Sequence, residues 1–581
     1  MSNLNRPNLI LLHAPSVYDF REQSTVYGPV SDVIPSTPIF EMYPLGFVSM
    51  IGYLEDHGYR SRIVNLAVKM LKDPSFDVEK FLEKMDSMAF GLDLHWLAHA
   101  NGSLAIAKLL KKHHPETPII LGGLSSTYYH KEILDEFPQI DYVLRGDSTE
   151  KPLLDLITNI EKEKRPETVQ NLSWRDDDGR KKINPLTYVP DSLDEVSLDY
   201  EVVVKLVLRH RDLESNLPYE NFLDYPFTAL LTCKGCTNNC VTCGGSQYSF
   251  SNFFGREKPA FKSPEKIVQE MKIISEYFKT PIFLLGDINQ AGQKYANSII
   301  ENIKKEKVDN TIMFELFNPA NEEFIKKISH SCESFSMEIS PDSHDENIRR
   351  LQGRFYSNEA LEKTVDNAIN FGAKKFDVFY MSGLPGQDVK SVLDSVTYAS
   401  TLMGKYSKNK NVYTFIAPMA PFLDPGSLAF ENPEKHGYHR LYSTLVEHRE
   451  ALSNPTWKHV LNYYTNSMSR DEIAYSTYEA MIKLNDAKMK IGITNIEKGK
   501  IIASGLTQTM ALIQKVDEII AQPNINNQQI KLNDLLRNSD TPLIVSRNYL
   551  KKELRVPGRA GLKPGGVIRG LIAYIEDIFK R

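Results

Sequence analysis

Four of the five cysteines of this chain lie within eleven residues, in the stretch TCKGCTNNCVTCGG at 232–245. They are spaced C-x2-C-x3-C-x2-C, at Cys233, Cys236, Cys240 and Cys243. Thiolates are soft ligands that suit zinc or iron–sulfur clusters. A structural zinc site usually takes two ligand pairs separated by a longer loop. Because the inner gap here is only three residues, the spacing favours an iron–sulfur cluster over zinc.

Composition narrows the class of protein. At 581 residues the chain is too long for one core, so several domains are expected. The net charge of −5 gives no overall nucleic-acid signal. No apolar run approaches the ~20 residues of a membrane span. The N-terminus lacks a basic region followed by an apolar core, so no signal peptide is expected. We therefore predict a cytoplasmic protein with no transmembrane segment.

The surroundings of the cysteines sharpen the prediction. The preceding stretch DYPFTALLTC (224–233) has the pattern of a buried strand, and Gly235 stands just before Cys236. The core pattern Cys236-x3-Cys240-x2-Cys243 resembles the cysteine loop of the radical S-adenosylmethionine (SAM) superfamily. The resemblance implies that these three thiolates hold a [4Fe-4S] cluster with one open iron, which binds the amino and carboxylate groups of SAM.

The same resemblance implies the chemistry. A reductant such as flavodoxin or ferredoxin supplies an electron, SAM is cleaved, and a 5′-deoxyadenosyl radical forms. The cofactors do the difficult step, and the protein positions and shields them. Gly244 and Gly245, directly after the last cysteine, are expected to contact SAM.

Two features depart from the family pattern. Thr242 stands where the family usually has an aromatic residue, and Cys233 is an extra cysteine at the strand end. A fourth cysteine ligand would close the open iron. Since Gly235-Cys236 falls where the first ligand of the family falls, we expect Cys233 to be a small buried hydrophobic residue.

Apolar strands and amphipathic helices alternate after the cysteines. Strands are predicted at 281–287, 311–317 and 334–340, and a helix at 263–278 begins with Ser263 as N-cap. This alternation predicts parallel β/α units. Residues 224–420 are therefore expected to form a partial (β/α)6 barrel, as in radical SAM enzymes, with the reactive site at the carboxyl ends of its strands.

Further SAM contacts are predicted at these strand ends. In the family, the end of strand four contacts the ribose and methionine parts of SAM, which implies roles for Glu338 and Ser340. Gly383, after strand five, would let the backbone approach the adenine. Arg354 lies where related enzymes carry an arginine that meets the SAM carboxylate. The alternatives are a structural carboxylate, an ordinary turn glycine and a surface arginine.

Residues 1–165 have a doubly wound, Rossmann-like α/β pattern. The stretches PIILGGLSSTYY and IDYVLRGDSTEKPLLDL closely resemble the cobalamin-binding domain that precedes many radical SAM domains. The resemblance implies that Gly122 and Gly123 let the nucleotide tail of cobalamin pass between strand and helix. The alternative is a Rossmann-like domain that has lost its ligand.

The stretch DLHWLA (93–98) nearly spells the D-x-H-x-x-G motif that supplies a histidine to cobalt. It has Ala98 in place of glycine, and it follows the third strand, whereas the motif of the family follows the first. We therefore do not assign His95 as an axial ligand. With Trp96 it is expected to lie near the lower face of a base-off cobalamin, which is open or held by water.

Residues 166–223 are predicted to be a linker with a short hairpin, and residues 421–581 a mainly helical domain that covers the barrel or selects the substrate. The last 41 residues hold nine Lys or Arg and three Asp or Glu. The final helix is predicted to carry its apolar residues on one face, at Val567, Ile568, Leu571, Ile572, Ile575, Ile578 and Phe579. That face either docks on the helical domain or contacts anionic lipid or phosphate.

These observations predict a cobalamin-dependent radical SAM enzyme. The favoured reaction is methylation of an unactivated carbon of a small molecule, lipid or peptide, with one SAM methylating cobalamin and another yielding the radical. The alternative is carbon–carbon coupling, cyclisation or rearrangement, for instance of a lipid. A third hypothesis is a non-catalytic cobalamin or metal sensor, against which the intact three-cysteine loop argues.

Overall fold

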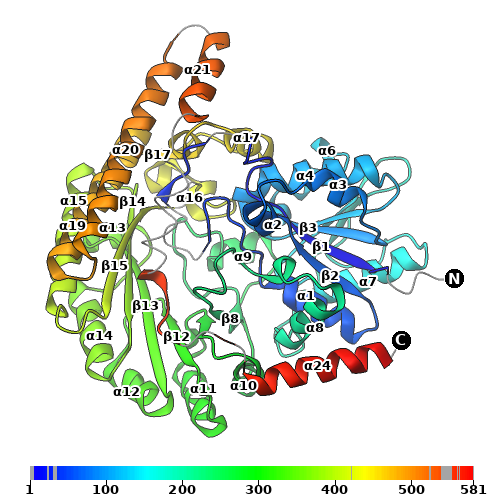
Figure 1. Cartoon of the computed structure of the whole chain (residues 1–581), viewed down its shortest axis with the longest axis horizontal. Helices are drawn as coiled ribbons and strands as arrows, with labels where there is room; N and C mark the ends of the chain where they lie inside the picture. The colour runs from blue at the N-terminus through cyan, green and yellow to red at the C-terminus, as the bar shows by residue number, and fades with distance from the viewer. Residues whose placement is uncertain are drawn as a thin grey trace.

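The structure is a computed structural model of the chain (Figure 1). It describes residues 6–22, 25–29, 36–419, 422–522, 525–537, 553–558, 561 and 563–579. Two parallel sheets organise it, one in the N-terminal third and one in the middle of the chain.

The N-terminal sheet has seven strands in the order β2-β1-β3-β4-β5-β6-β7. Its strands are β1 (Leu9–His13), β2 (Ser61–Asn65), β3 (Ala89–Asp93), β4 (Ile119–Gly122), β5 (Tyr142–Leu144), β6 (Leu172–Arg175) and β7 (Lys181–Ile183). The first five are parallel. All residues of β1 and β3 are buried, as expected for strands covered on both faces by helices. The doubly wound fold predicted for this region is confirmed.

Helices cover both faces of this sheet. They are α1 (Gly46–Asp56), α2 (Leu66–Lys72), α3 (Val78–Glu83), α4 (Ala100–His113), α5 (Leu124–Tyr128), α6 (His130–Glu136) and α7 (Glu150–Glu161), with the short 3-10 helix η2 (Leu97–His99). The hairpin predicted in the linker forms as β6 and β7, which pair antiparallel with the sheet edge. The sheet therefore continues to Ile183, past the boundary predicted at residue 165.

A helix that the sequence analysis left as linker connects the two sheets. Helix α8 (Tyr200–His210) begins at Asp199, whose side chain accepts a hydrogen bond from the backbone N–H of Glu201, and the 3-10 helix η3 (Glu214–Asn216) follows. Helix α8 packs against α1 and against α10 (Pro264–Tyr277) of the barrel.

The second sheet is the predicted partial barrel, with six parallel strands in the order β15-β14-β13-β12-β11-β8. Its strands are β8 (Thr228–Leu231), β11 (Ile282–Leu285), β12 (Thr311–Leu316), β13 (Ser334–Asp342), β14 (Phe376–Ser382) and β15 (Val412–Pro418). Its helices are α9 (Gln247–Phe253), α10 (Pro264–Tyr277), α11 (Gln293–Glu306), α12 (Glu322–Ser331), α13 (Glu346–Leu351), α14 (Asn358–Asn370) and α15 (Val389–Lys405), with the 3-10 helix η4 (Ile288–Ala291). Ser263 caps α10 as predicted, by accepting from the backbone N–H of Lys266.

Two short ribbons accompany the barrel. Strands β9 (Cys233–Lys234) and β10 (Ala260–Phe261) pair antiparallel beside the cysteine loop. Strands β16 (Tyr438–Arg440) and β17 (Tyr463–Thr465) pair in the C-terminal region.

The C-terminal region is mainly helical, as predicted. It contains α16 (Leu428–Glu431), η5 (Glu434–His436), α17 (Leu445–Ala451), α18 (Trp457–Val460), α19 (Arg470–Ile491), α20 (Ile496–Ile520) and α21 (Ile525–Arg537). Helix α19 packs against α15 and β15, so this region covers the far side of the barrel, and α20 and α21 project beyond it (Figure 1).

The last helix, α24 (Pro564–Phe579), does not dock on this helical region. It packs against α8 and α10, at the opposite edge of the barrel (Figure 1). The prediction that this helix docks on the C-terminal helical domain is therefore wrong. Helices α8 and α10 provide its docking surface instead. No helix among the described residues has the length and apolar character of a membrane span.

Candidate functional site

The two sheets meet at a cavity of about 1140 Å³. The carboxyl ends of the N-terminal strands form one wall, and the cysteine loop forms the other. Among the predicted site residues, the cavity is lined by Gly122, Gly123, His95, Trp96, Cys236, Cys243 and Gly245. The structure therefore brings the predicted cobalamin contacts and two of the three cluster cysteines to one space.

The two glycines at the end of β4 have different reasons for lacking a side chain. A Cβ on Gly122 would find no atom within 4 Å, so the space above this residue is open to a ligand. A Cβ on Gly123 would lie 2.5 Å from the backbone nitrogen of His95, and its φ of +118° is one that other residues rarely adopt. Gly123 therefore lets the loops after β3 and β4 touch, and Gly122 leaves room over them.

In the stretch 93–98, the carboxylate of Asp93 bonds a histidine other than His95. The carboxylate of Asp93 bonds Nδ1 of His13 at 2.8 Å, and both side chains are buried. His95 instead lines the cavity, where burial lowers the pKa of its imidazole. Ligand histidines usually have their second nitrogen fixed by a carboxylate or carbonyl. Asp93 already serves His13, a pairing that the sequence analysis missed because 80 residues separate the two.

The cysteine loop offers three thiols and backbone N–H groups directed at sulfur. The N–H of Asn238 points to Sγ of Cys236 at 3.4 Å, and that of Gly245 to Sγ of Cys243 at 3.3 Å. Such hydrogen bonds tune iron–sulfur clusters. No three His, Cys, Asp or Glu side chains of the described residues converge on a single metal ion. A cubane spreads its ligands over separate irons, so this chemistry fits a cluster held by Cys236, Cys240 and Cys243.

Cys233 is the first residue of strand β9, at the start of the cysteine loop. Its side chain is buried, and its Sγ accepts from the amide of Gln290 at 3.7 Å. Burial raises the pKa of its thiol to about 12 and that of the Cys236 thiol to about 11, so the shift does not distinguish Cys233 from the predicted ligands. A Cβ on Gly286 would lie 2.9 Å from this sulfur. These contacts agree with the prediction of a small buried residue, although Cys233 also lines the cavity.

The C-terminal region holds the cysteine loop from behind. Oδ2 of Asp424 accepts from the N–H of Gly244 at 3.0 Å, and the N–H of Ala429 donates to the carbonyl of Val241 at 2.9 Å. A Cβ on Gly244 would lie 2.8 Å from Cβ of Asp424. Gly244 is therefore required by packing, and it does not line the cavity. The turn signal D-P-G after the last barrel strand could have pointed to Asp424, but not to its partner.

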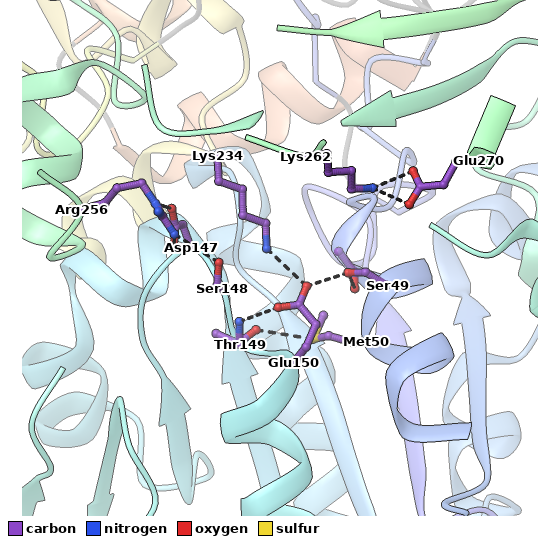
Figure 2. A network of polar contacts seen from close by, with 11 residues as sticks. Ser49, Met50, Asp147, Ser148, Thr149, Glu150, Lys234, Arg256, Lys262 and Glu270 are labelled. Atoms are coloured by element: carbon purple, nitrogen blue, oxygen red, sulfur yellow. Dashed lines mark hydrogen bonds and ion pairs between the residues drawn. The ribbon is translucent and has the colours of Figure 1, made fainter. Parts of the chain in front are cut away.

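A polar network ties the strand end that precedes Cys236 to the N-terminal domain (Figure 2). Oε1 of Glu150, on α7, accepts from Ser49 Oγ at 2.8 Å and from Lys234 Nζ at 3.2 Å. Arg256 forms a buried ion pair with Asp147. These bonds connect the start of the cysteine loop to the N-terminal domain, whose strand end carries Gly122 and Gly123. They therefore support the spacing between the two walls of the cavity.

Inside the barrel, three carboxylates form a row that the sequence analysis did not predict as a group. Glu315, Glu338 and Asp377 occupy neighbouring positions on β12, β13 and β14. Burial raises the pKa of Glu315 to about 7 and that of Asp377 to about 6. Burial, and then the Glu315 carboxylate, raise the pKa of Glu338 well above its usual value. The sequence signal that could have indicated Glu315 and Asp377 is an acidic residue in the middle of an apolar strand, in MFELF and KFDVF.

The remaining predicted SAM contacts are distributed around the barrel mouth. Nε of Arg354 bonds Oδ2 of Asp342 at 2.6 Å, which fixes the guanidinium beside Cys240. A Cβ on Gly383 would lie 2.9 Å from the hydroxyl of Tyr463, so packing requires this glycine. Ser340 is half-buried on β13. Glu338, Ser340, Arg354 and Gly383 do not line the shared cavity, whereas Glu315 reaches its edge through the N–H of Gly286 at 2.7 Å.

Comparison with known proteins identifies two domains of the chain. Residues 33–153 match the B12 binding domain, and residues 230–399 match the radical SAM superfamily. The matched segments are those whose strands carry Gly122 and the cysteine loop. Among solved structures, the cobalamin-dependent SAM radical enzyme OxsB, with aqua-cobalamin and SAM bound, aligns with a TM-score of 0.54. The alignment covers 99% of this chain and 81% of that one, and its 12% identity shows a shared fold.

Two curated relatives differ in the reaction they are named for. A protein of Pyrococcus horikoshii described as an uncharacterized methyltransferase is 23% identical over 372 residues, covering 63% of this chain and 74% of that protein. The anaerobic magnesium-protoporphyrin IX monomethyl ester cyclase of Rubrivivax gelatinosus is 22% identical over 248 residues, covering 42% of this chain and 41% of that enzyme. The chain thus joins a B12-binding domain to a radical SAM domain, and it belongs to the cobalamin-dependent radical SAM enzymes.

Proposed function

We propose that this enzyme methylates an unactivated carbon. The observation that supports the proposal is the single cavity lined by Gly122 and His95 on one wall and by Cys236 and Cys243 on the other. When bound, the cluster and SAM supply a carbon-centred radical, and cobalamin supplies a methyl group. Methyl transfer needs both reagents to reach one substrate carbon, which a shared cavity permits.

Residues of the chain would hold these groups at a fixed spacing. Cys236, Cys240 and Cys243 would bind the cluster, and the open space over Gly122 would accept the cobalamin. The ion pair of Lys234 with the buried Glu150 joins the two walls and would support them at this spacing. Arg354, held by Asp342, is the candidate for the SAM carboxylate, and Glu338 for the ribose hydroxyls.

The cavity would also position the substrate for the radical. A 5′-deoxyadenosyl radical abstracts hydrogen from C–H and S–H bonds within reach, so its site needs to hold the substrate carbon closest. Most of the cavity lining is apolar, and Trp96 is part of it. We infer that the electron comes from a small reductant such as flavodoxin or ferredoxin, which the cluster requires from outside the chain.

A second candidate reaction is radical ring closure or carbon–carbon coupling. The similarity to the Rubrivivax gelatinosus enzyme supports it, because that relative is named for a ring closure. In such a reaction the radical chemistry is retained, but no methyl group reaches the product. The stoichiometry of the SAM products therefore separates the two reactions.

The test is anaerobic incubation of reconstituted enzyme with SAM labelled in its methyl group and extracts of the source cells as substrate. Methylation is expected to give labelled product, with S-adenosylhomocysteine and 5′-deoxyadenosine formed in equal amounts. Ring closure or coupling would give 5′-deoxyadenosine with an unlabelled product and no matching S-adenosylhomocysteine. That second pattern would overturn the methylation proposal.

A further inference from the structure

The cavity has an arm that neither cofactor explains. It runs from the cysteine loop along α8 and under the segment 213–227 to the start of α24. Its walls are aliphatic and aromatic, with Val204, Val207, Leu208, Phe222, Phe283 and Leu571 among them. Cobalamin and SAM both carry many polar groups, which such walls could not satisfy. The arm is therefore suited to an apolar group of the substrate.

The outer end of the arm reaches the surface. Three of its lining residues, Leu213, Leu223 and Leu571, are 48%, 59% and 47% exposed. They come from the segment after α8 and from α24, so the mouth lies between these elements. Large apolar side chains gathered at one opening are unfavourable in water and typically mark a binding surface.

Helix α24 shows its apolar face to the outside. It docks through small residues: Gly566 and Gly570 are buried, and a Cβ on Gly566 would lie 2.5 Å from Cα of Tyr277. The outward residues Ile568, Leu571, Ile572 and Ile575 are 47–59% exposed. A helix covering a core normally does the reverse. The predicted apolar face therefore exists, but its described side chains are about half exposed instead of buried, and Leu571 lines the arm as well. The side chains of Val567, Ile578 and Phe579 lie outside the described residues.

Charge indicates what covers this face. The last 41 residues hold nine Lys or Arg and three Asp or Glu, in a chain whose overall charge is −5. Lys563 and Arg569 anchor α24 to Asp309 and Glu276, at the edge of the barrel. Within α24 itself Arg569 stands with Glu576 and Asp577, so the surplus of basic residues lies before and after the helix in the sequence. A helix with large apolar residues outward and basic flanks in the sequence is typical of a protein that lies in the interface of an anionic membrane.

We propose that α24 lies in the surface of an anionic bilayer and that the apolar arm takes up the hydrocarbon chain of a membrane lipid, which is the substrate. The mouth of the arm and the exposed face of α24 share Leu571, so a chain can pass from the bilayer into the arm without crossing water. The inner end of the arm reaches Cys236 and Cys243, where the proposed methylation would occur. The substrate class rests on the proposed function, whereas membrane binding does not.

The membrane part is tested with the full-length reconstituted enzyme and sedimented vesicles. Binding to phosphatidylglycerol vesicles is expected, with weaker binding to phosphatidylcholine and loss in 1 M salt, where the screening length is about 3 Å. Ile572→Glu is expected to weaken binding about tenfold or more. The matched control is Ile501→Glu on α20, since Ile501 is 54% exposed and Ile572 51%, and it should bind as the wild type does.

The arm is tested with cis-parinaric acid, whose fluorescence rises in apolar surroundings. Saturable binding to the enzyme without vesicles is expected. Val207→Trp would fill the arm and weaken that binding about tenfold, whereas Val207→Ala would retain it. Cobalamin absorbance and thermal melting show that both variants are folded, and a Val207→Trp variant that fails to fold is replaced by Leu208→Trp.

The outcomes separate this inference from the proposed function. An enzyme that makes S-adenosylhomocysteine but binds neither vesicles nor cis-parinaric acid would overturn the lipid inference and leave methylation standing. An enzyme that binds both and forms 5′-deoxyadenosine and an altered lipid, but no S-adenosylhomocysteine, would overturn methylation and leave the lipid substrate standing. A dimer in solution that is lost in Ile572→Glu, without vesicle binding, would show that a second copy covers α24, and would also overturn the lipid inference.

Discussion

The two walls of the shared cavity are built by opposite means. On the N-terminal sheet the wall is formed by residues without side chains, most clearly at Gly122, where an added Cβ would find no atom within 4 Å. The barrel contributes reactive side chains, namely the thiols of the cysteine loop and the carboxylate row behind them. One wall makes room for a large preformed ligand, and the other supplies ligands and charge. Ligand binding at the N-terminal wall should therefore be lost when a substitution adds a side chain, and ligand binding at the barrel wall when a substitution removes one.

The largest effect is expected from removing atoms on the barrel side. Replacing Cys236, Cys240 or Cys243 by Ala should abolish SAM cleavage, because two thiolates cannot hold the cluster. Iron content, cluster absorbance and 5′-deoxyadenosine formation measure the loss. By contrast, Cys233→Ala should keep the cluster, because the predicted ligand spacing uses only the other three thiols, and the buried Cys233 side chain contacts Gln290 and lies close to Gly286.

That pair of outcomes also tests the ligand assignment. If Cys233→Ala lost the cluster while one of the other three variants kept it, the fourth cysteine would be a ligand. The prediction of an open iron, and with it the predicted role of the loop in SAM binding, would then be wrong.

Adding atoms on the other wall is the next test. Gly123→Val should destabilise the N-terminal domain by about 2–4 kcal/mol, because it forces a side chain against the backbone of His95 at a positive φ. Gly122→Leu should change the free energy of unfolding by less than about 1 kcal/mol, since its side chain enters open space. It should nevertheless prevent cobalamin binding.

Chemical denaturation and titration with hydroxocobalamin distinguish these two effects. If Gly122→Leu bound cobalamin with the wild-type affinity, the open space over this strand end would not be the ligand site. The doubly wound fold would stand, and the assignment of its cavity would not.

Sequence reasoning succeeded on features that are local in the chain and failed on features that cross it. The strand–helix alternation and the cysteine spacing lie within short stretches, so the two folds could be predicted from them. The ligand roles of Cys236, Cys240 and Cys243 and the roles of Gly122 and Gly123 stay predictions. The row of Glu315, Glu338 and Asp377 depends on the pairing of three strands, and the His13–Asp93 bond joins residues 80 positions apart. No local pattern encodes such contacts.

The position of α24 illustrates the same limit. Its amphipathic pattern was visible in the sequence, but the pattern alone does not say which face docks. The buried Gly566 and Gly570 decide it, because small residues allow close approach to α10 and α8. A helix packed through its glycines leaves its isoleucines outside, against the usual expectation.

The carboxylate row makes the barrel wall sensitive to pH. Burial raises the pKa of Glu315 to about 7, so the folded state favours its protonated form. Its contribution to stability is fully present below the ordinary glutamate pKa and is lost as pH rises to about 7. We expect this group to lower the free energy of unfolding by about 1–3 kcal/mol between pH 5 and pH 8. Glu315→Gln keeps the acceptor for Gly286 N–H and should remove that decline.

Denaturation curves across this pH range measure the effect. Glu359→Gln, on the exposed start of α14, is the matched control and should leave the decline unchanged. Because Glu315 and Glu338 are neighbours, they should titrate as a pair, and an unaltered pH profile in Glu315→Gln would mean that Glu338 carries the effect alone.

The smallest effect is expected at His95, on the glycine wall. A cobalt-binding histidine gains basicity and orientation from a carboxylate on its other nitrogen. Here Asp93, the carboxylate nearest in the motif, is bound to His13 at 2.8 Å. His95 is therefore left as a lining residue whose imidazole is neutral near pH 7, because burial lowers its pKa. His95→Ala should leave a base-off cobalamin spectrum nearly unchanged and lower the affinity for hydroxocobalamin no more than a few-fold. His13→Ala is the informative companion, because it frees the Asp93 carboxylate. A base-off spectrum with histidine bound to cobalt that disappears in His95→Ala would show that this wall, like the other, supplies a ligand, and the contrast between the two walls would fail at that point.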